Sequence, residues 1–223
     1  HLEHIRAAVA MFGPIFHQLY GQGEAPMTIS YLPGRDHLGA EDETLLSAGY
    51  VRAGVEVRIR DEDDRDVPDG TDGEICVRGD VVMAGYWRNP EANARALAGG
   101  WLHTGDVGHF DAGGRLRILD RRHDTIISGG TNIYPKEIED VLASHPRVRE
   151  VAAFGVPDAE WGESVAVAVV ANDPALGEVD LLAICREHLA SFKKPKHVHI
   201  VQELPKNAYG KVLRRELQAM FRR

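Results

Sequence analysis

Alternating apolar and polar residues mark several short strands in the first half of the chain. The clearest is 55-VEVRIRD-61, where every second residue is apolar, as in a half-buried strand. The stretches 74-EICVRG-79 and 115-RLRIL-119 alternate in the same way and are bounded by Gly-containing turns. Short strands with such turns predict a small antiparallel sheet or barrel within residues 1–119. A helix-like stretch, 5-IRAAVAMFG-13, precedes them.

The pattern changes after the charged run 120-DRRHD-124, which we interpret as a linker or hinge. Residues 124–223 combine helical and strand patterns, so the chain is predicted to be α+β. Pro135 suits the first turn of a helix in which Ile138 and Leu142 share a face with Val141. The other predicted elements of this half are strands at 148–156, 164–171 and 197–201 and a helix at 179–190.

Composition narrows the class of protein. The hydrophobic fraction of 43% and the charged fraction of 27% are typical of a soluble globular protein. The net charge of -8 argues against a general nucleic-acid binder, and the longest apolar run, 165-VAVAVVA-171, is too short to span a bilayer. Cys76 and Cys185 lie far apart without metal-ligand spacing, which predicts reduced, packed thiols in a cytoplasmic protein. The sequence leaves open whether the protein forms a homodimer.

Two stretches in the first half carry candidate nucleotide chemistry. In 20-YGQGE-24, an exposed Tyr20 beside two glycines can present an aromatic face, and Glu24 can present a carboxylate. In 101-WLHTGD-106, a tight turn can present the carboxylate of Asp106 to two adjacent ribose hydroxyls. Taken singly, each stretch is more often an ordinary turn.

Three further stretches lie in the second half. Gly129 and Gly130, within 117-RILDRRHDTIISGGTNIYPKEIE-139, allow a backbone to approach a ligand closely, although an ordinary strand-to-helix loop has the same composition. Trp161 offers a stacking face, or it is a packed surface tryptophan. Lys211 follows Gly210 and can meet a phosphate or carboxylate as a mobile point charge, although most such lysines only solvate a surface.

Six motifs occur together in one order along the chain. They are YGQGE (20–24), GEICVRGDVVMAGYWRNPEAN (73–93), WLHTGD (101–106), DRRHDTIISGGTNIYPKEIE (120–139), VPDAEWGE (156–163) and PKNAYGKVLRREL (205–217). This order resembles the adenylate-forming superfamily, and within it the acyl-CoA synthetases, from about Phe12 to Leu217. Members of that family also carry a Ser/Thr/Gly-rich phosphate loop upstream, which this sequence lacks.

The resemblance implies the C-terminal part of a longer AMP-forming carboxylic acid–CoA ligase for fatty or aryl acids. Residues 1–119 are then the β-rich end of the large N-terminal domain, 120–123 a hinge, and 124–223 a small, mobile α+β domain. The implied reaction uses ATP, Mg²⁺ and CoA. A carboxylate attacks the α-phosphate, pyrophosphate leaves, the small domain rotates, and the CoA thiol displaces AMP. We expect the chain alone to have little or no ligase activity.

The resemblance also implies roles for individual residues. Glu24 helps to hold Mg²⁺, and Lys211 bridges the substrate carboxylate and the α-phosphate, so these two are the implied catalytic residues. Tyr20 stacks on adenine, Asp106 binds the ribose hydroxyls, and Arg121 adds a contact there. The implied nucleotide-binding positions are Tyr20, Gly21, Asp106, Arg121 and Lys211.

A second set of residues is implied for CoA. The loop that begins at Ser128 would line the pantetheine tunnel, Trp161 would lie along CoA, and Phe192 would stack on its adenine while nearby lysines meet its phosphates. The implied CoA-binding residues are Ser128, Gly129, Gly130, Asn132, Trp161, Phe192, Lys194 and Lys196, with Thr131 in the same loop.

Three positions depart from the family pattern. Gly23 stands where Thr is usual, so one phosphate contact is in doubt, and Asn207 replaces a commoner Thr with little expected effect. The hinge position is His123 instead of Asp or Lys, which leads to the hypothesis of a pH-sensitive domain rotation. Two alternatives remain open: an adenylation domain that loads a carrier protein, and a non-catalytic CoA- or nucleotide-binding module.

Overall fold

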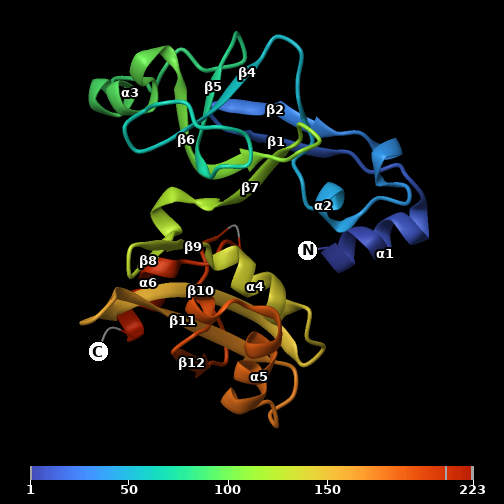
Figure 1. The fold of residues 1–223 in the computed structure, drawn as a ribbon, viewed down its shortest axis with the longest axis vertical. Helices are drawn as coiled ribbons and strands as arrows, with labels where there is room; N and C mark the ends of the chain where they lie inside the picture. Colours follow the sequence, from blue (N-terminus) through green and yellow to red (C-terminus); the bar gives the residue numbers. More distant parts are fainter. Residues whose placement is uncertain (1, 209, 222–223) are drawn as a thin grey trace. The chain divides into compact units, whose positions relative to one another are not determined.

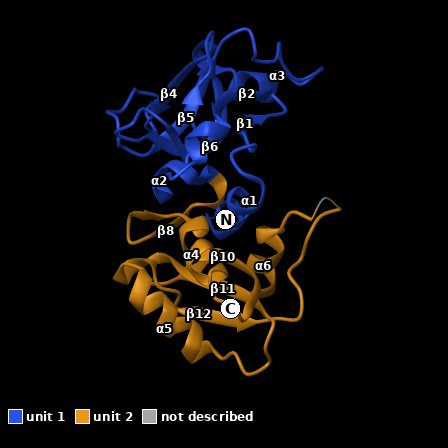
Figure 2. Ribbon diagram, turned by 90° about the vertical axis from the view of Figure 1, so that its right-hand side faces the viewer, with its two compact units in different colours: residues 1–122 blue, residues 123–223 orange. Residues whose placement is uncertain are grey.

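The computed structural model describes residues 2–208 and 210–221 and divides into two compact units. Unit 1 comprises His1–Arg122 and unit 2 comprises His123–Arg223 (Figure 2). The boundary falls inside the segment 120–123, and the hinge role of that segment stays a prediction. Across the described residues, no helix has the length and apolar character needed to cross a membrane.

Unit 1 contains two antiparallel sheets (Figure 1). The first has the order β1-β2-β3 and the second β4-β5-β6-β7, so neighbouring strands follow each other along the chain. The elements are α1 (Leu2–Phe12), β1 (Gln18–Gln22), β2 (Ala25–Leu32), η1 (Gly34–His37), α2 (Asp42–Leu45), β3 (Tyr50–Val51), β4 (Glu56–Arg60), β5 (Gly73–Arg78), α3 (Pro90–Ala96), η2 (Ala98–Gly100), β6 (Leu102–Phe110) and β7 (Leu116–Arg121). The prediction of antiparallel sheets in an α+β protein is confirmed.

One apolar cluster joins the two sheets of unit 1. Ile29 from β2 packs in the same core as Ile59, Ile75 and Leu102 from β4, β5 and β6. The predicted alternation in β4 has this physical basis, since Ile59 points into the core while its neighbours in the strand are more exposed. Tyr20 belongs to the same cluster, which places the first candidate motif at the edge of a packed core.

Unit 2 is a five-stranded sheet with helices (Figure 1). The central strand β11 runs antiparallel to β10 and β8 and parallel to β12. The elements are η3 (Arg122–Asp124), β8 (Ile126–Ser128), β9 (Thr131–Ile133), α4 (Pro135–Ala143), β10 (Val148–Asp158), β11 (Gly162–Ala171), α5 (Glu178–His188), η4 (Ser191–Lys193), β12 (His197–Ile200) and α6 (Arg214–Phe221). Pro135 opens α4 as predicted, with Ile138 and Leu142 fully buried.

The continuous apolar run in β11 is explained by burial on both faces. Val165, Val167 and Val169 point into a core that they share with residues of α4 and α5. The intervening residues, Ala166 and Ala168 among them, point into a second core that includes Leu217 of α6. A strand covered on both sides has no polar face, so its sequence does not alternate.

Arg214 ties the start of α6 to the rest of unit 2. Its guanidinium pairs with Asp124 Oδ2 at 3.1 Å and Glu139 Oε1 at 2.7 Å, and its Nε donates to the Ala153 carbonyl at 3.1 Å. Glu139 Oε1 also accepts the Ala153 N–H at 2.9 Å. The three charged side chains are mostly buried. The sequence gave no signal for this role, since the partners of Arg214 lie far away along the chain.

Replacing Arg214 by Ala should destabilise unit 2 by about 3 kcal/mol, because two mostly buried carboxylates lose their cation. Amide hydrogen exchange of the whole chain measures this, since it reports each unit separately. Exchange should accelerate in α6, α4 and β10 and stay unchanged in residues 2–122. The matched control is Arg215→Ala, which removes the neighbouring exposed arginine. Equal effects of the two substitutions would contradict the anchoring role.

Candidate functional site

The first candidate motif forms the hairpin between β1 and β2. Gly23 and Glu24 make its two-residue turn, flanked by the pair Gln22 and Ala25. A Cβ at Gly21 would lie 2.2 Å from the backbone nitrogen of Met27, so a glycine is required for this hairpin to close. Gly21 therefore has a structural role besides the predicted contact with nucleotide.

The carboxylate of Glu24 is oriented by a residue to which the sequence analysis gave no role. The hydroxyl of Tyr86 donates to Glu24 Oε1 at 2.6 Å. This hydrogen bond raises the pKa of Tyr86, which keeps the phenol neutral and able to donate. The backbone of the same loop adds a second contact, from the N–H of Met83 to the Glu24 carbonyl at 2.8 Å. Glu24 thus has a defined orientation before any ligand binds.

Asp106 lies between two donors from different strands. Its Oδ2 accepts the hydroxyl of Tyr20 at 2.6 Å, and its Oδ1 pairs with Nε of Arg121 at 2.8 Å. Arg121 stands opposite Asp106 in the register of β6 and β7, so the sheet itself sets this pair. The Asp106 side chain is only 7% exposed. The structure therefore brings three of the predicted nucleotide-binding residues together.

The prediction of an exposed Tyr20 is wrong. Tyr20 is only 8% exposed, because its ring packs in the core of unit 1 and its hydroxyl is bound to Asp106. Burial, followed by the charge of Asp106, raises the pKa of Tyr20, so the phenol stays a neutral donor. Stacking of the Tyr20 ring on adenine stays a prediction.

The predicted tight turn before Asp106 is a bulge inside β6. The register with β5 jumps from the pair Cys76 and His103 to the pair Glu74 and Val107, which leaves extra residues on β6. Gly105 adopts φ +70 there, and the hydroxyl of Thr104 accepts the Asp106 N–H at 3.1 Å. The bulge turns the Asp106 side chain toward Tyr20 without ending the strand.

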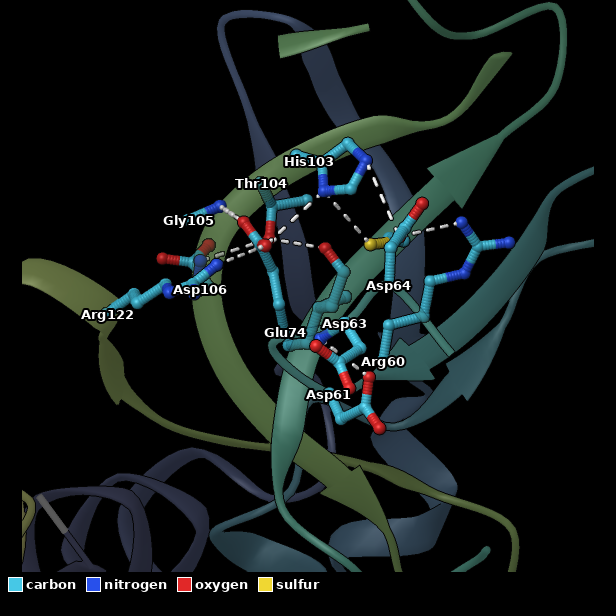
Figure 3. Close-up of polar contacts among 12 residues, drawn as sticks. Arg60, Asp61, Asp63, Asp64, Glu74, His103, Thr104, Gly105, Asp106 and Arg122 are labelled. Atoms are coloured by element: carbon cyan, nitrogen blue, oxygen red, sulfur yellow. Dashed lines mark hydrogen bonds and ion pairs between the residues drawn. The ribbon is translucent and has the colours of Figure 1, made fainter. Parts of the chain in front are cut away.

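Glu74 holds the same bulge from the neighbouring strand (Figure 3). Its Oε1 accepts the Gly105 N–H at 3.0 Å, and its Oε2 pairs with Arg122 at 3.0 Å and approaches His103 Nδ1 at 3.3 Å. The sequence gave no signal for this role, because it depends on the register between β5 and β6.

Lys211 lies on a hairpin that Lys206 and Val212 close. Lys206 and Val212 form an antiparallel bridge, the N–H of Asn207 donates to the Lys211 carbonyl at 2.9 Å, and the Lys211 N–H donates to Asn207 Oδ1 at 2.9 Å. Gly210 adopts φ +80, a conformation that favours glycine. The hairpin therefore holds the Lys211 backbone in place, and Asn207 has a role that the sequence analysis underestimated.

Gly129 and Gly130 form the turn of a two-residue hairpin between β8 and β9, with φ values of +58 and +77. The expected loop leading to a helix is thus a hairpin, since β9 follows the glycines. A Cβ at Gly129 would lie 2.5 Å from Cε3 of Trp161, and the Gly129 N–H donates to the Trp161 carbonyl at 2.9 Å. The missing side chain of Gly129 makes room for the indole ring.

Lys196 approaches the same indole. Its Nζ lies 5.7 Å from the Trp161 ring centroid and 2.9 Å from Asp158 Oδ2. The bond from Lys196, together with backbone N–H donors, lowers the pKa of Asp158 to about 2. Three of the predicted CoA-binding residues, Gly129, Trp161 and Lys196, are therefore neighbours in unit 2.

The remaining predicted residues occupy separate surroundings. Phe192 is exposed on η4, where Nζ of Lys193 lies 5.5 Å from its ring centroid. Lys194 lies close enough to Cys185 to oppose the burial that raises the pKa of that thiol to about 11. Ser128 pairs with Gly162, and Asn132 stands exposed opposite Ile127. His123 is exposed, with Nε2 at 3.6 Å from Asp124 Oδ1, and its hinge role stays a prediction.

Two family models match the chain. The model described as "AMP-binding enzyme" covers residues 1–87, and the model described as "AMP-binding enzyme C-terminal domain" covers residues 137–211. A long-chain-fatty-acid–CoA ligase from Escherichia coli O6:H1 is 49% identical over 172 residues, which is 77% of this chain and 31% of that protein. The chain thus spans about a third of the length of this relative.

Two solved structures are similar to nearly the whole chain. The amide bond synthetase McbA from Marinactinospora thermotolerans has a TM-score of 0.89 and 40% identity, over 99% of this chain and 44% of its own. The o-succinylbenzoate CoA synthetase from Bacillus subtilis, solved with its acyl-adenylate intermediate, has a TM-score of 0.89 and 37% identity, over 97% of this chain and 43% of its own. A further structure of that synthetase contains ATP and a magnesium ion.

The packing of Trp161 on Gly129 can be tested with a pair of glycine substitutions. Gly129→Ala and Gly130→Ala should each cost about 1–2 kcal/mol, because both glycines have positive φ. Only Gly129→Ala should displace the indole, since a Cβ at Gly130 meets nothing within 4 Å. In ¹⁹F NMR of protein labelled with 5-fluorotryptophan, the Trp161 resonance should shift in Gly129→Ala and stay in place in Gly130→Ala. A Trp161 resonance unmoved by either change would contradict the packing.

Proposed function

This chain belongs to the AMP-binding, adenylate-forming enzyme family, and on that premise we propose that it forms part of an AMP-forming carboxylic acid–CoA ligase. The reaction joins a carboxylic acid to CoA, with cleavage of ATP to AMP and pyrophosphate. The observation that carries the proposal is the buried Asp106 carboxylate, held by Tyr20 and by Arg121, which stands opposite Asp106 in the register of β6 and β7.

Asp106 has the properties that a ribose site requires. Tyr20 and Arg121 each bond one of its oxygens, and a carboxylate oxygen can accept more than one hydrogen bond, which suits a pair of vicinal hydroxyls. Tyr20 and Arg121 hold the carboxylate before nucleotide arrives, which lowers the entropy cost of binding. Gly21 keeps the backbone beside Tyr20 free of side-chain bulk.

Glu24 suits a magnesium ion that accompanies ATP. Magnesium prefers oxygen ligands and is commonly bound by one or two carboxylates together with substrate phosphates. The Glu24 carboxylate is partly exposed at a hairpin turn, and Tyr86 fixes one of its oxygens. Bound there, the ion would neutralise charge on the phosphates during adenylate formation.

Lys211 is the cation that we assign to adenylate formation. When the substrate carboxylate attacks the α-phosphate, negative charge develops on the phosphate oxygens and pyrophosphate leaves. The Lys211 side chain is exposed and extends from a hairpin whose backbone is fixed by Asn207. A side chain with a defined base and a flexible ammonium can bridge the carboxylate and the phosphate.

CoA is the acceptor that we assign to the second half-reaction. Trp161 and Lys196 offer an aromatic face and a cation side by side, beside a hairpin without side-chain bulk at Gly129 and Gly130. Phe192 and Lys194 would meet the nucleotide end of CoA. The similarity to CoA ligases supports this acceptor, whereas the similarity to McbA favours an amine acceptor as the second candidate.

The experiment is a product assay on the complete protein that contains these residues. It is supplied with ATP, Mg²⁺ and a panel of long-chain fatty and aryl carboxylic acids, with either CoA or a mixture of amines. Mass spectrometry separates acyl-adenylate, thioester and amide. Thioester is the expected product, adenylate followed by amide would assign an amine acceptor, and no pyrophosphate release with any acid would overturn the proposal.

Lys211→Ala should lower the rate of adenylate formation at least about 100-fold, because the developing phosphate charge loses a positioned cation. Thioester formation from a supplied acyl-adenylate should change only a few-fold, since that step starts from a phosphate that already carries the acyl group. Single-turnover kinetics of each half-reaction measure the two effects. Lys206→Ala is the control, because Lys206 lies on the same hairpin and pairs with Glu150. Equal loss in both half-reactions would argue against the assignment.

Asp106→Asn should raise the KM for ATP about tenfold or more, because an amide presents one acceptor oxygen where a carboxylate presents two. The KM for the carboxylic acid should stay within about twofold. Steady-state kinetics with each substrate varied in turn measure both values. Asp72→Asn serves as control, since Asp72 is an exposed carboxylate paired with His109. A KM for ATP that does not move would remove Asp106 from the nucleotide site.

A further inference from the structure

Three side chains with different donor atoms meet on the second sheet of unit 1 (Figure 3). One atom each from Asp64, Cys76 and His103 lies within 4.8 Å of the other two. Cys76 and His103 stand directly opposite each other in the register of β5 and β6, with Sγ 3.6 Å from Nδ1. Asp64, from the turn before β5, approaches from the other side of the imidazole, with Oδ1 3.8 Å from Nε2.

The imidazole of His103 has one nitrogen without a hydrogen bond. Among the described residues, Nε2 of His103 is buried and has no hydrogen-bond partner, since Asp64 Oδ1 at 3.8 Å is too far away. A buried polar atom without a partner costs free energy, so such an atom in a folded protein points to a missing ligand or water. This nitrogen faces the Asp64 carboxylate.

The surroundings of the cluster favour a cation. Cys76 is fully buried, and the carboxylates of Glu74, Asp64 and Asp66 lie near its thiol. Arg60 is a neighbouring cation that opposes these charges. Arg60 already bonds Asp64 Oδ1 at 2.9 Å, so it is the group with which an added cation would share that carboxylate. Arg60 and Arg122, which pairs with Glu74, therefore compensate only part of the carboxylate charge near the thiol.

We propose that Asp64, Cys76 and His103 bind a thiophilic divalent cation such as Zn²⁺. Sulfur, imidazole nitrogen and carboxylate oxygen together form a donor set typical of zinc, whereas magnesium prefers oxygen alone. Bonds of about 2.0–2.3 Å in a tetrahedral site separate the ligand atoms by roughly 3.3–3.8 Å. One donor atom from each of the three side chains lies within 4.8 Å of the other two, so a modest side-chain adjustment brings them to this spacing around one nitrogen of His103. On binding, the Cys76 thiol releases its proton to solvent, a bond forms between sulfur and metal, and water fills the fourth position.

Glu74 connects this cation site to the backbone that holds Asp106. Its Oε2 lies 3.3 Å from Nδ1 of His103, and its Oε1 accepts the N–H of Gly105 at 3.0 Å. The residue after Gly105 is Asp106, so a cation that reorients His103 or Glu74 acts on the bulge that presents this carboxylate. The cation site is nevertheless separate from Glu24, the residue assigned to magnesium.

The test is titration of the metal-free chain with Co²⁺, followed by its thiolate-to-cobalt charge-transfer absorption in the near ultraviolet. Wild type should bind one Co²⁺ with this band, and Zn²⁺ should displace the Co²⁺ while excess Mg²⁺ should not. Cys76→Ser should abolish the band. Cys185→Ser is the matched control, because Cys185 is also a free, buried thiol but lies in unit 2, and it should leave the band unchanged.

Asp64→Asn provides a second variant that preserves the fold. Asp64 is exposed and has φ +61, a conformation that Asn also tolerates. Because even loss of a residue that only supports a ligand weakens metal binding about 10–100-fold, loss of this ligand should raise the Co²⁺ dissociation constant at least about tenfold. Absence of the band in wild type, its persistence in Cys76→Ser, or unchanged affinity in Asp64→Asn would overturn the proposal. None of these readouts depends on ligase activity.

Discussion

A carboxylate that is buried away from water needs hydrogen-bond or ion-pair donors to replace its lost hydration. In unit 1, the carboxylate of Asp106 is buried and has such donors. Its partners come from β1 of the other sheet and from β7 of its own. The Tyr20 hydrogen bond therefore fastens the two sheets together beside their shared apolar core, while the ion pair with Arg121 joins β6 to β7. The hydrogen bonds that make the carboxylate tolerable also fix its direction. The site that we propose for ribose hydroxyls therefore rests on the same contacts that stabilise the fold.

Unit 2 contains a mostly buried cation whose lost hydration is compensated in the same way. Arg214 is withdrawn from water and is compensated by Asp124, Glu139 and a backbone carbonyl of β10. These contacts hold the first turn of α6 against the first residues of the unit and against α4. Lys211 precedes Arg214 by three residues, so the exposed cation of the hairpin is attached to one of the most firmly held points of unit 2.

Local pattern predicted most of the elements but not their long-range partners. The alternation in β4 and the proline at the start of α4 are local signals, and both predictions were confirmed. The parallel pairing of β12 with β11 has no local signature, since any strand can pair in either direction. The bulge at Gly105 was predicted as a turn for the same reason, because the partner strand β5 decides whether the chain reverses or continues.

The candidate site shows the same difference between local signals, which the sequence reveals, and long-range contacts, which it does not. The motifs predicted side chains that we propose to face ligands, but not the residues that orient them, such as Tyr86 beside Glu24 and Asn207 beside Lys211. The contact between Cys76 and His103 could not be predicted from the sequence either, since 27 positions separate them along the chain. Supporting contacts of this kind depend on register, and register is set by the packing of whole strands.

The small side chains on one face of β11 affect how the sequence of such a protein can change during evolution. Ala166 and Ala168 allow α6 to lie close to the sheet, with Leu217 packed in the same core. A methyl group added at either alanine would push α6 away from the sheet. The hairpin that carries Lys211 precedes α6 directly and would move with it. With the role proposed for Lys211, a change in volume at this buried position would therefore alter adenylate formation without touching a ligand.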